Sequence, residues 1–437
     1  MDFFQKMNAK PCDCGREHDF RSRVISGKAA LLKLPELVRE LGGSRAYILS
    51  DRNTWPVAGQ KTAALLQQQG IDWVSCCMAE DTPEPDEHSV GSALMHYDAA
   101  CDIIIGVGSG VINDIGKLLS AAVKKPYIIV ATAPSMDGYA SATSSMVRGG
   151  MKISLSSKSP EGIIGDTDIL CTAPLHMMRS GLGDVLAKYV AICEWRISHL
   201  ITGEYYCEQV AQLVRRALKR CIDGAPGLMN REESAVQAVF EGLVLSGVAM
   251  NFAGLSRPAS GVEHYISHVL DMRSVEFGTP CDLHGIQCAV GTLIAVKLYE
   301  KLVKITPNRE KALAYVESFD YDSWAGELRG LIGKGAQAMI DLEKKEGKYD
   351  KVRHAARLEK ILGSWEEILA IISEELPSAA DLERLMDSLG MPKTLSQLGT
   401  KDEELPLIFR ATKDIRDKYV LSHLAWDLGI VNEILEK

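Results

Sequence analysis

The amino-acid sequence predicts an α/β protein in which a doubly wound parallel sheet is followed by an all-helical region. Two observations support this prediction. Up to about residue 173, short apolar runs alternate with helical patterns, as strands and crossover helices do in a parallel sheet. From residue 174 onward, long amphipathic patterns continue almost to the C-terminus, which indicates helices. We therefore expect one domain at 1–173 and a second at 174–437.

The expected strands are short, continuous apolar runs that end at glycine, aspartate or threonine. Such runs are typical of strands that are buried on both faces of a parallel sheet. Helical periodicity appears between several of them and indicates the crossover helices. The expected strands cover residues 46–51, 72–76, 102–108, 127–132, 152–157 and 162–170, and the expected helices between them cover 62–70 and 112–125.

Size and composition narrow the class of protein. The chain has 437 residues, enough for two domains, and its formal net charge of −9 argues against a broad nucleic-acid-binding surface. We find no apolar run of the roughly 18–20 residues that span a bilayer. The first residues lack the apolar core of a secretory signal. We therefore expect a cytoplasmic protein that binds no nucleic acid and does not insert into a membrane.

The chain contains 11 cysteines, which we expect to be mostly buried thiols in a reducing compartment. One group, Cys12, Cys14 and His18, places three soft ligands close together and could bind zinc. The spacing of its two cysteines is tighter than the usual zinc pattern, and no second ligand pair follows nearby. The sequence alone therefore favours buried thiols at this place over a structural metal.

The main candidate for a cofactor site is the turn after the expected strand 102–108. Gly108, Ser109 and Gly110 form this turn, and a helix begins near Val111–Asn113. Glycines let the backbone approach a pyrophosphate, and a helix N-terminus supplies N–H groups and the positive end of a dipole. An ordinary strand–helix turn is the alternative. The strand before the turn and the helix after it favour phosphate binding.

Two other polar positions follow expected strands. Asp51 ends the run 46–51, where a carboxylate can accept hydrogen bonds from the ribose of a dinucleotide. Aspartate is also a common turn residue, so both interpretations stay open. The segment 131–146 is a polar loop that contains Asp137 and Ser141. It is either a ligand-binding loop at the carboxyl end of a strand or a plain Asp-Gly turn.

The helical region contains a carboxylate and three histidines of interest. Asp184 follows two glycines at the expected start of a helix, so it is either an N-cap or a metal ligand. His264 and His268 are four residues apart and share one helix face. They are not the H-E-x-x-H metalloprotease signature, because the glutamate precedes the first histidine. His284 precedes a long apolar helix. Its side chain could cap that helix, pack as a ring in the core or bind a metal.

Five stretches in order carry a resemblance to a known superfamily: "GSGVINDIGK", "ATAPSMDGYAS", "GLGDVLAKY", "SGVEHYISHVLD" and "HGIQCAVGT". Over roughly residues 10–300 the chain resembles the iron-containing alcohol dehydrogenases, glycerol dehydrogenases and dehydroquinate synthases. Within this group it is most similar to the sn-glycerol-1-phosphate dehydrogenase family in its bacterial form, to which the N-terminal "CDCGREH" also points. The resemblance implies a Rossmann-like domain and a helical domain arranged as in dehydroquinate synthase.

The resemblance also implies the site residues. One divalent metal, zinc or nickel, is expected on Asp184, His264 and His284, although the stretch before His284 is a few residues longer than the family pattern. Asp137, Asp184 and His268 are then expected to contact the substrate and take part in catalysis. NAD, or else NADP, is expected to lie on Asp51, Gly108, Ser109, Gly110, Val111, Ile112, Asn113, Asp114, Thr132 and Ser141.

The implied reaction is hydride transfer between NAD(P)H and dihydroxyacetone phosphate, which gives sn-glycerol 1-phosphate. The metal is expected to polarise the ketone, and the cofactor supplies the hydride. The substrate is thus a small phosphorylated triose, and the resemblance implies a homodimer. Asp51 would repel the 2′-phosphate of NADP, which favours NAD.

Three other functions stay open at this point. One is a glycerol or other polyol dehydrogenase on the same scaffold. A second is a lyase of the dehydroquinate synthase type, which is disfavoured because the site stretches contain few basic residues, chiefly Lys152 and Arg257. A third is a nucleotide-binding regulator without activity. The presence of Asp184, His264 and His284 disfavours the regulator, which has no need of a metal site.

Overall fold

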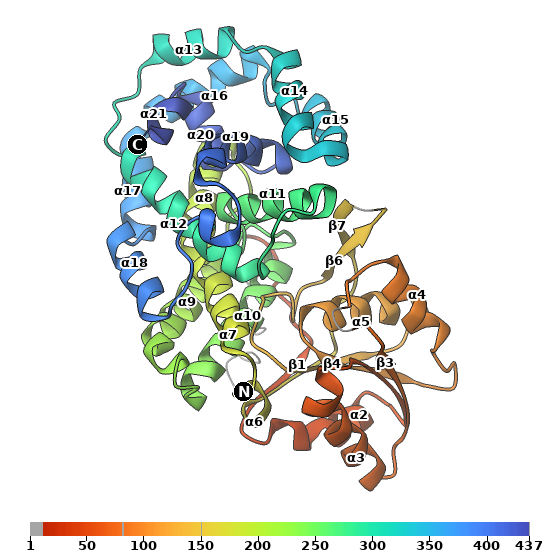
Figure 1. Ribbon diagram of the computed structural model, residues 1–437. Coiled ribbons are helices and arrows are strands. Elements are labelled where there is room, and N and C mark those ends of the chain that lie inside the picture. Colours follow the sequence, from red (N-terminus) through yellow and green to blue (C-terminus); the bar gives the residue numbers. More distant parts are fainter. Residues whose placement is uncertain (1–11, 81–82, 150, 437) are drawn as a thin grey trace. The chain divides into compact units, whose positions relative to one another are not determined.

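The computed structural model describes residues 12–80, 83–149 and 151–436 (Figure 1). The chain forms two compact units. Unit 1 comprises Met1–Val185 and Gln209–Leu255, and unit 2 comprises Leu186–Glu208 and Ser256–Lys437. Each unit therefore combines two segments of the chain. The domain boundary expected after residue 173 marks the end of the strand-rich sequence. The compact units are defined differently and do not test it, so this boundary stays a prediction.

Unit 1 is built on a six-stranded parallel sheet with the order β1-β8-β5-β4-β2-β3. The chain reverses direction across the sheet at β2 and β4, because β3 pairs with one edge of β2 and β4 with the other. Ligands of open α/β sheets bind at such a switch point, beyond the carboxyl ends of the strands. The strands are β1 (Arg23–Gly27), β2 (Arg45–Asp51), β3 (Asp72–Met78), β4 (Ile103–Gly108), β5 (Tyr127–Ala131) and β8 (Gly162–Asp166).

Helices cover both faces of this sheet, with α4 and α5 on one side and α2 and α3 on the other (Figure 1). All six residues of β4 are buried, as expected for a strand that is covered on both faces. The helices of unit 1 are α2 (Leu34–Glu40), α3 (Gln60–Gln68), α4 (Glu87–Met95), α5 (Gly110–Val123), α6 (Thr167–Leu170), α7 (Leu175–Leu186), α9 (Glu208–Leu228) and α10 (Glu233–Ala253), with short turns of helix at Ala30–Lys33 and Trp55–Gly59.

The structure confirms the predicted doubly wound sheet and corrects several of its parts. Strand β1 was not predicted. The expected strand at 152–157 is β7 (Met151–Ser156), which lies outside the main sheet and pairs antiparallel with β6 (Thr143–Arg148). The second half of the run 162–170 is helix α6 and not strand. The chain leaves the sheet there because the Asp166 carboxylate accepts a hydrogen bond from the N–H of Asp168 and caps the helix.

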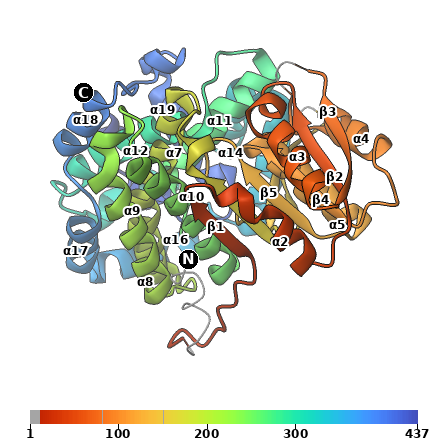
Figure 2. The same cartoon turned by 90° about the horizontal axis from the view of Figure 1, so that it is seen from below.

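Helix α10 corrects one expectation from composition. By length and hydropathy it is apolar enough to cross a membrane, although no such run was expected from the sequence. Of its most apolar window, 83% is buried inside the structure. It packs beside β1 (Figure 2), where Ser26 donates a hydrogen bond of 2.6 Å to Glu241. Its apolar surface is therefore accounted for by the core of unit 1.

The described part of unit 2 is helical, as predicted. Helices α11 and α12 pack closely against each other, because a side chain at Gly291 would lie only 2.6 Å from the backbone oxygen of Glu263. The helices of unit 2 are α8 (Lys188–Thr202), α11 (Val262–Phe277), α12 (His284–Leu302), α13 (Arg309–Glu317), α14 (Tyr321–Ile332), α15 (Ala336–Glu346), α16 (Lys351–Gly363), α17 (Trp365–Glu375), α18 (Ala379–Ser388), α19 (Leu405–Ile415), α20 (Leu421–Asp427) and α21 (Val431–Leu435), with short 3₁₀ turns at Gly333–Gly335, Ser396–Leu398 and Asp402–Glu404.

Candidate cofactor and metal sites

The turn between β4 and α5 has the form expected of a phosphate-binding turn. Strand β4 ends at Gly108 and helix α5 begins at Gly110, so a single residue, Ser109, separates them. A side chain at Gly108 would lie 2.5 Å from Ile112, so the turn depends on glycine at this position. The first N–H groups of a helix have no partner within it, and here they lie at the switch point of the sheet.

The loop after β5 is held against α5 by a buried lysine. Lys117 donates hydrogen bonds to the backbone oxygen of Gly138 and to Ser141 Oγ, each at 3.2 Å. It also lies 3.0 Å from the carboxylate of Asp114. Asn113 donates a further bond of 2.9 Å to the Gly138 oxygen. The expected cofactor residues Asn113, Asp114 and Ser141 are thus linked to one another within unit 1.

Sequence reasoning did not single out Lys117, although a signal was present. It lies four residues after Asn113, on the same face of an otherwise apolar helix. A lysine in such a pattern is fully buried only when it is paired, as it is here. Thr132 follows β5 and donates its N–H to the Gly108 oxygen at 3.0 Å. This bond joins the loop directly to the end of β4.

Asp51 has an identified structural role at the end of β2. Its Oδ1 accepts hydrogen bonds of 2.8 Å from the N–H groups of both Asn53 and Thr54. The N–H of Asp51 in turn donates a bond of 3.0 Å to the Thr54 hydroxyl. The carboxylate therefore fixes the turn that follows the strand. The residue lies at the switch point, as the cofactor interpretation requires, so the two interpretations are compatible.

Asp137 and Asp184 lie together in unit 1. The N–H of Asp137 donates a hydrogen bond of 2.9 Å to Asp184 Oδ2, and Ser246 Oγ donates one of 2.8 Å to Asp137 Oδ2. Helix α7 approaches the loop very closely, because a side chain at Gly181 would lie 1.8 Å from the Pro134 oxygen. The N-cap interpretation of Asp184 is wrong, since α7 begins at Leu175 and Asp184 lies in its last turn.

Three histidines gather in unit 2, and we refer to His264, His268 and His284 as the histidine cluster. His264 and His268 lie on α11, and His284 is the first residue of α12. The ring centroids of His264 and His284 are 5.1 Å apart, and those of His268 and His284 are 6.0 Å apart. His264 is buried, whereas His268 and His284 are half-buried. The structure thus brings together the two histidines expected to bind metal.

Neighbouring polar groups orient these rings. His264 Nδ1 lies 2.8 Å from Glu263 Oε1, and Ser267 Oγ lies 3.1 Å from His284 Nδ1. Carboxylate and hydroxyl groups in such positions fix the orientation of histidines that bind metals. The carboxylate of Glu194 accepts the N–H of Val262 at 2.9 Å and so caps the start of α11. Burial, and then the charge of Glu263, raise the pKa of this Glu194 carboxyl.

Cys288 is a further donor that sequence reasoning missed. Its Sγ lies 3.6 Å from His284 Nε2. This sulfur and one ring nitrogen from each of His264 and His284 all lie within 4.8 Å of one another. Burial by itself raises the pKa of this thiol, but the two histidines outweigh burial and lower the pKa. The sequence did hold an indication of this donor, because Cys288 lies four residues after His284 and so shares its helix face. Imidazole nitrogens and a thiol are donors that suit zinc or nickel.

Arg257, one of the few basic residues in the site stretches, has a structural role. Its Nε donates hydrogen bonds of 2.9 and 2.8 Å to the two carboxylate oxygens of Glu204. Its Nη2 donates one of 2.8 Å to the Tyr419 oxygen, and the side chain is fully buried. The guanidinium is therefore occupied within unit 2. This role weakens the lyase alternative, which relies on basic residues that face an anionic substrate.

Comparisons with known proteins place the chain among dehydrogenases. A family profile described as iron-containing alcohol dehydrogenase matches residues 25–174. The glycerol-1-phosphate dehydrogenase [NAD(P)+] of Halalkalibacterium halodurans is 30% identical over 390 residues, which is 88% of each chain. The protein of the same name from Bacillus licheniformis is 31% identical over 350 residues, 78% of this chain and 87% of the relative.

A solved structure shows the same fold. The crystal structure of glycerol dehydrogenase from Schizosaccharomyces pombe superposes with a TM-score of 0.62 at 18% sequence identity. The match covers 96% of this chain and 91% of that one. At this identity the similarity concerns the fold alone.

Proposed function

The chain belongs to the glycerol-1-phosphate dehydrogenase family, within the iron-containing alcohol dehydrogenases, and from this premise we propose its activity. It is an NAD(P)-linked, metal-dependent oxidoreductase that interconverts dihydroxyacetone phosphate and sn-glycerol 1-phosphate. The main support for the proposal is the sequence identity to glycerol-1-phosphate dehydrogenases over most of the chain. The turn between β4 and α5 supports the cofactor, and the histidine cluster supports the metal.

The dinucleotide binds at the switch point of the sheet in this proposal. The pyrophosphate lies on the turn of Gly108, Ser109 and Gly110, where the N–H groups of the first turn of α5 can donate to its oxygens. Thr132 and Ser141 lie on the loop that Lys117 holds against α5. Asp51 accepts hydrogen bonds from the adenosine ribose and favours NAD over NADP.

Asp184, His264 and His284 hold the metal, zinc or nickel, in this proposal. The family resemblance supports this ligand set, and the 5.1 Å separation of the His264 and His284 rings supports the histidine pair. When bound, such a metal polarises the carbonyl oxygen of the substrate. Cys288 is the competing donor, because it lies within reach of the same two histidines.

The remaining residues bind and orient the substrate. His268 lies one turn after His264, with its ring stacked on that of His284, and donates a hydrogen bond to a substrate oxygen. Ser246 and the bond to Asp184 fix the position of Asp137, so that its carboxylate accepts a bond from a substrate hydroxyl. Both residues align the carbonyl carbon with the nicotinamide, because hydride transfer requires close and oriented approach of two carbons. We further propose a cytoplasmic homodimer.

A substrate panel tests this proposal. The purified protein is mixed with NADH and either dihydroxyacetone phosphate or dihydroxyacetone. In a third mixture it is given NAD and a polyol such as glycerol. We expect dihydroxyacetone phosphate to be reduced with the largest kcat/KM, and a chelator to abolish the activity until zinc or nickel is returned. Preference for the unphosphorylated compounds would instead identify a polyol dehydrogenase. Absence of hydride transfer in every mixture would contradict the proposal.

A further inference from the structure

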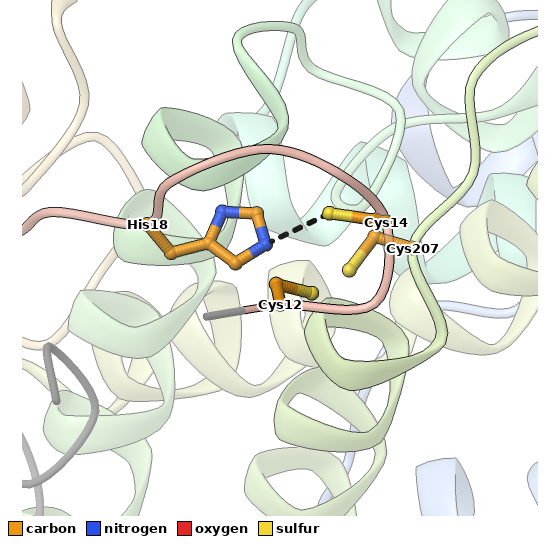
Figure 3. Close-up of side chains that lie close together, drawn as sticks. All are labelled: Cys12, Cys14, His18 and Cys207. Carbon is orange, nitrogen blue, oxygen red and sulfur yellow. Dashed lines mark hydrogen bonds between the residues drawn. The ribbon is translucent and has the colours of Figure 1, made fainter. Parts of the chain in front are cut away.

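Four soft donors gather at one place that the proposed reaction does not use. They are Cys12, Cys14, His18 and Cys207, which we call the cysteine cluster (Figure 3). The three sulfur atoms and one ring nitrogen of His18 all lie within 4.8 Å of one another. Cys14 Sγ lies 3.4 Å from His18 Nε2. Figure 3 shows the three sulfur atoms and the imidazole directed into one common space.

A tight turn presents the first two thiols. The N–H of Gly15 donates a hydrogen bond of 3.0 Å to the Cys12 oxygen, which closes a four-residue turn. Gly15 has a φ of 77°, a left-handed conformation that favours glycine. The short C-x-C spacing, which argued against zinc in the sequence, therefore places both thiols on one turn. Both can then reach the same point.

Contacts with α10 fix the segment that carries His18. Arg16 Nη1 donates a hydrogen bond of 2.6 Å to the Ala253 oxygen, at the C-terminal end of that helix. The ring of His18 packs on Phe252 at a centroid distance of 5.0 Å. A cation is favourable at this end of a helix because of the helix dipole. These contacts hold the imidazole in place without any metal.

The fourth donor comes from a distant part of the chain. Cys207 immediately precedes α9, and that helix belongs to unit 1 from Gln209 onward. Cys207 lies two residues before that point, at the end of the first segment of unit 2. Cys207 and Cys12 are buried, and Cys14 and His18 are half-buried. Because only the fold brings Cys207 to the turn, the sequence could not reveal a complete ligand set.

We propose that the cysteine cluster binds one structural Zn²⁺ ion through three thiolates and one imidazole. Three cysteines and one histidine form a usual ligand set of structural zinc sites. Zinc forms bonds of about 2.3 Å to sulfur and 2.0–2.1 Å to nitrogen. In a tetrahedral site, a sulfur and a nitrogen bound to the same ion are therefore about 3.6 Å apart, and two sulfurs are about 3.8 Å apart. The 3.4 Å between Cys14 Sγ and His18 Nε2 is close to this geometry.

Four protein ligands leave no open position on the ion, so the site has a structural role and not a catalytic one. The ion links the N-terminal turn to the start of α9, across a separation in sequence of almost half the chain. Such a link stabilises the folded state, because the unfolded chain does not hold the four donors together. The proposal is independent of the dehydrogenase activity.

Zinc analysis in a His264→Ala background tests the site apart from the proposed catalytic metal. We expect this variant to retain about one zinc per chain by elemental analysis. The double variant His264→Ala/Cys14→Ser is expected to lose it. The matched control His264→Ala/Cys171→Ser, which changes another half-buried cysteine, is expected to keep it. Absence of zinc in His264→Ala, or its retention after Cys14→Ser, would overturn the proposal.

Cobalt substitution provides a second readout that does not depend on the fold of the Cys14→Ser variant. Protein produced with cobalt in place of zinc is expected to show a thiolate-to-cobalt charge-transfer band in the His264→Ala background. A thiol-blocking mercurial should release the ion and abolish the band. His18→Cys should keep the ion, because four thiolates also form a structural zinc site. A spectrum without the thiolate band would contradict the proposal, whether or not the protein reduces dihydroxyacetone phosphate.

Discussion

The cysteine cluster and the histidine cluster differ in the donors they offer and in how the fold assembles them. The cysteine cluster combines a turn, the segment after it and the residue before α9, and it offers three sulfurs and one nitrogen. The histidine cluster lies on two helices that pack against each other, and its donors are chiefly nitrogens. A set of four protein donors completes a tetrahedral ion, whereas a smaller set leaves positions for substrate. In our two proposals, the number of protein donors therefore separates a structural site from a catalytic one.

The largest effect is expected from His264→Ala. Loss of this ligand should remove the metal of the histidine cluster while leaving the zinc of the cysteine cluster in place. A metal contributes several kcal/mol of charge stabilisation, so kcat/KM with dihydroxyacetone phosphate should fall by roughly a thousandfold or more. Elemental analysis and steady-state kinetics measure both quantities. Full activity in the variant would show that the two clusters do not divide the roles in this way.

His268→Ala should have a smaller effect of a different kind. One lost hydrogen bond to a charged group typically costs about 1.5–3 kcal/mol, which corresponds to about ten- to a hundredfold in kcat/KM. Metal content should stay at the level of the parent protein, because His268 contacts substrate in our proposal. If His268→Ala removes the metal as completely as His264→Ala does, both histidines are ligands and the proposed ligand set with His284 is wrong.

Gly291→Ala tests how the histidine cluster is assembled. The added methyl group would lie 2.6 Å from the Glu263 oxygen and should force α11 and α12 apart. Overpacking of this kind costs about 1–3 kcal/mol of stability. Gly330→Ala is the matched control, because nothing lies within 4 Å of its added methyl group. Denaturant unfolding of both variants measures the difference, and equal stability would mean that the close approach of the helices is not required.

The smallest effect is expected at the cofactor. Asp51→Asn keeps an oxygen that can accept the N–H groups of Asn53 and Thr54, but it removes the charge that repels a 2′-phosphate. The ratio of activity with NADPH to that with NADH should rise by about tenfold, which corresponds to about 1.4 kcal/mol. Kinetics with the two cofactors measure this ratio. An unchanged ratio would assign Asp51 to the turn alone.

Local patterns predicted much of the fold and most members of the two clusters. The strands at β2, β4 and β5 were predictable because continuous apolar runs mark buried parallel strands. The pairing of His264 with His268 follows from helical spacing alone. Tertiary contacts were not predictable in this way. Cys207 completes the cysteine cluster from far along the chain, and the position of Asp184 in α7 depends on a helix that starts earlier than the sequence indicated.

The stereochemistry of the reduced product tests the central claim most directly. The purified protein is incubated with NADH, a divalent metal and dihydroxyacetone phosphate, and the product is then offered to an enzyme specific for sn-glycerol 3-phosphate. We predict that NADH is consumed and that the product, sn-glycerol 1-phosphate, is not oxidised by that second enzyme. A product that the second enzyme oxidises completely, or no consumption of NADH, would contradict the assignment.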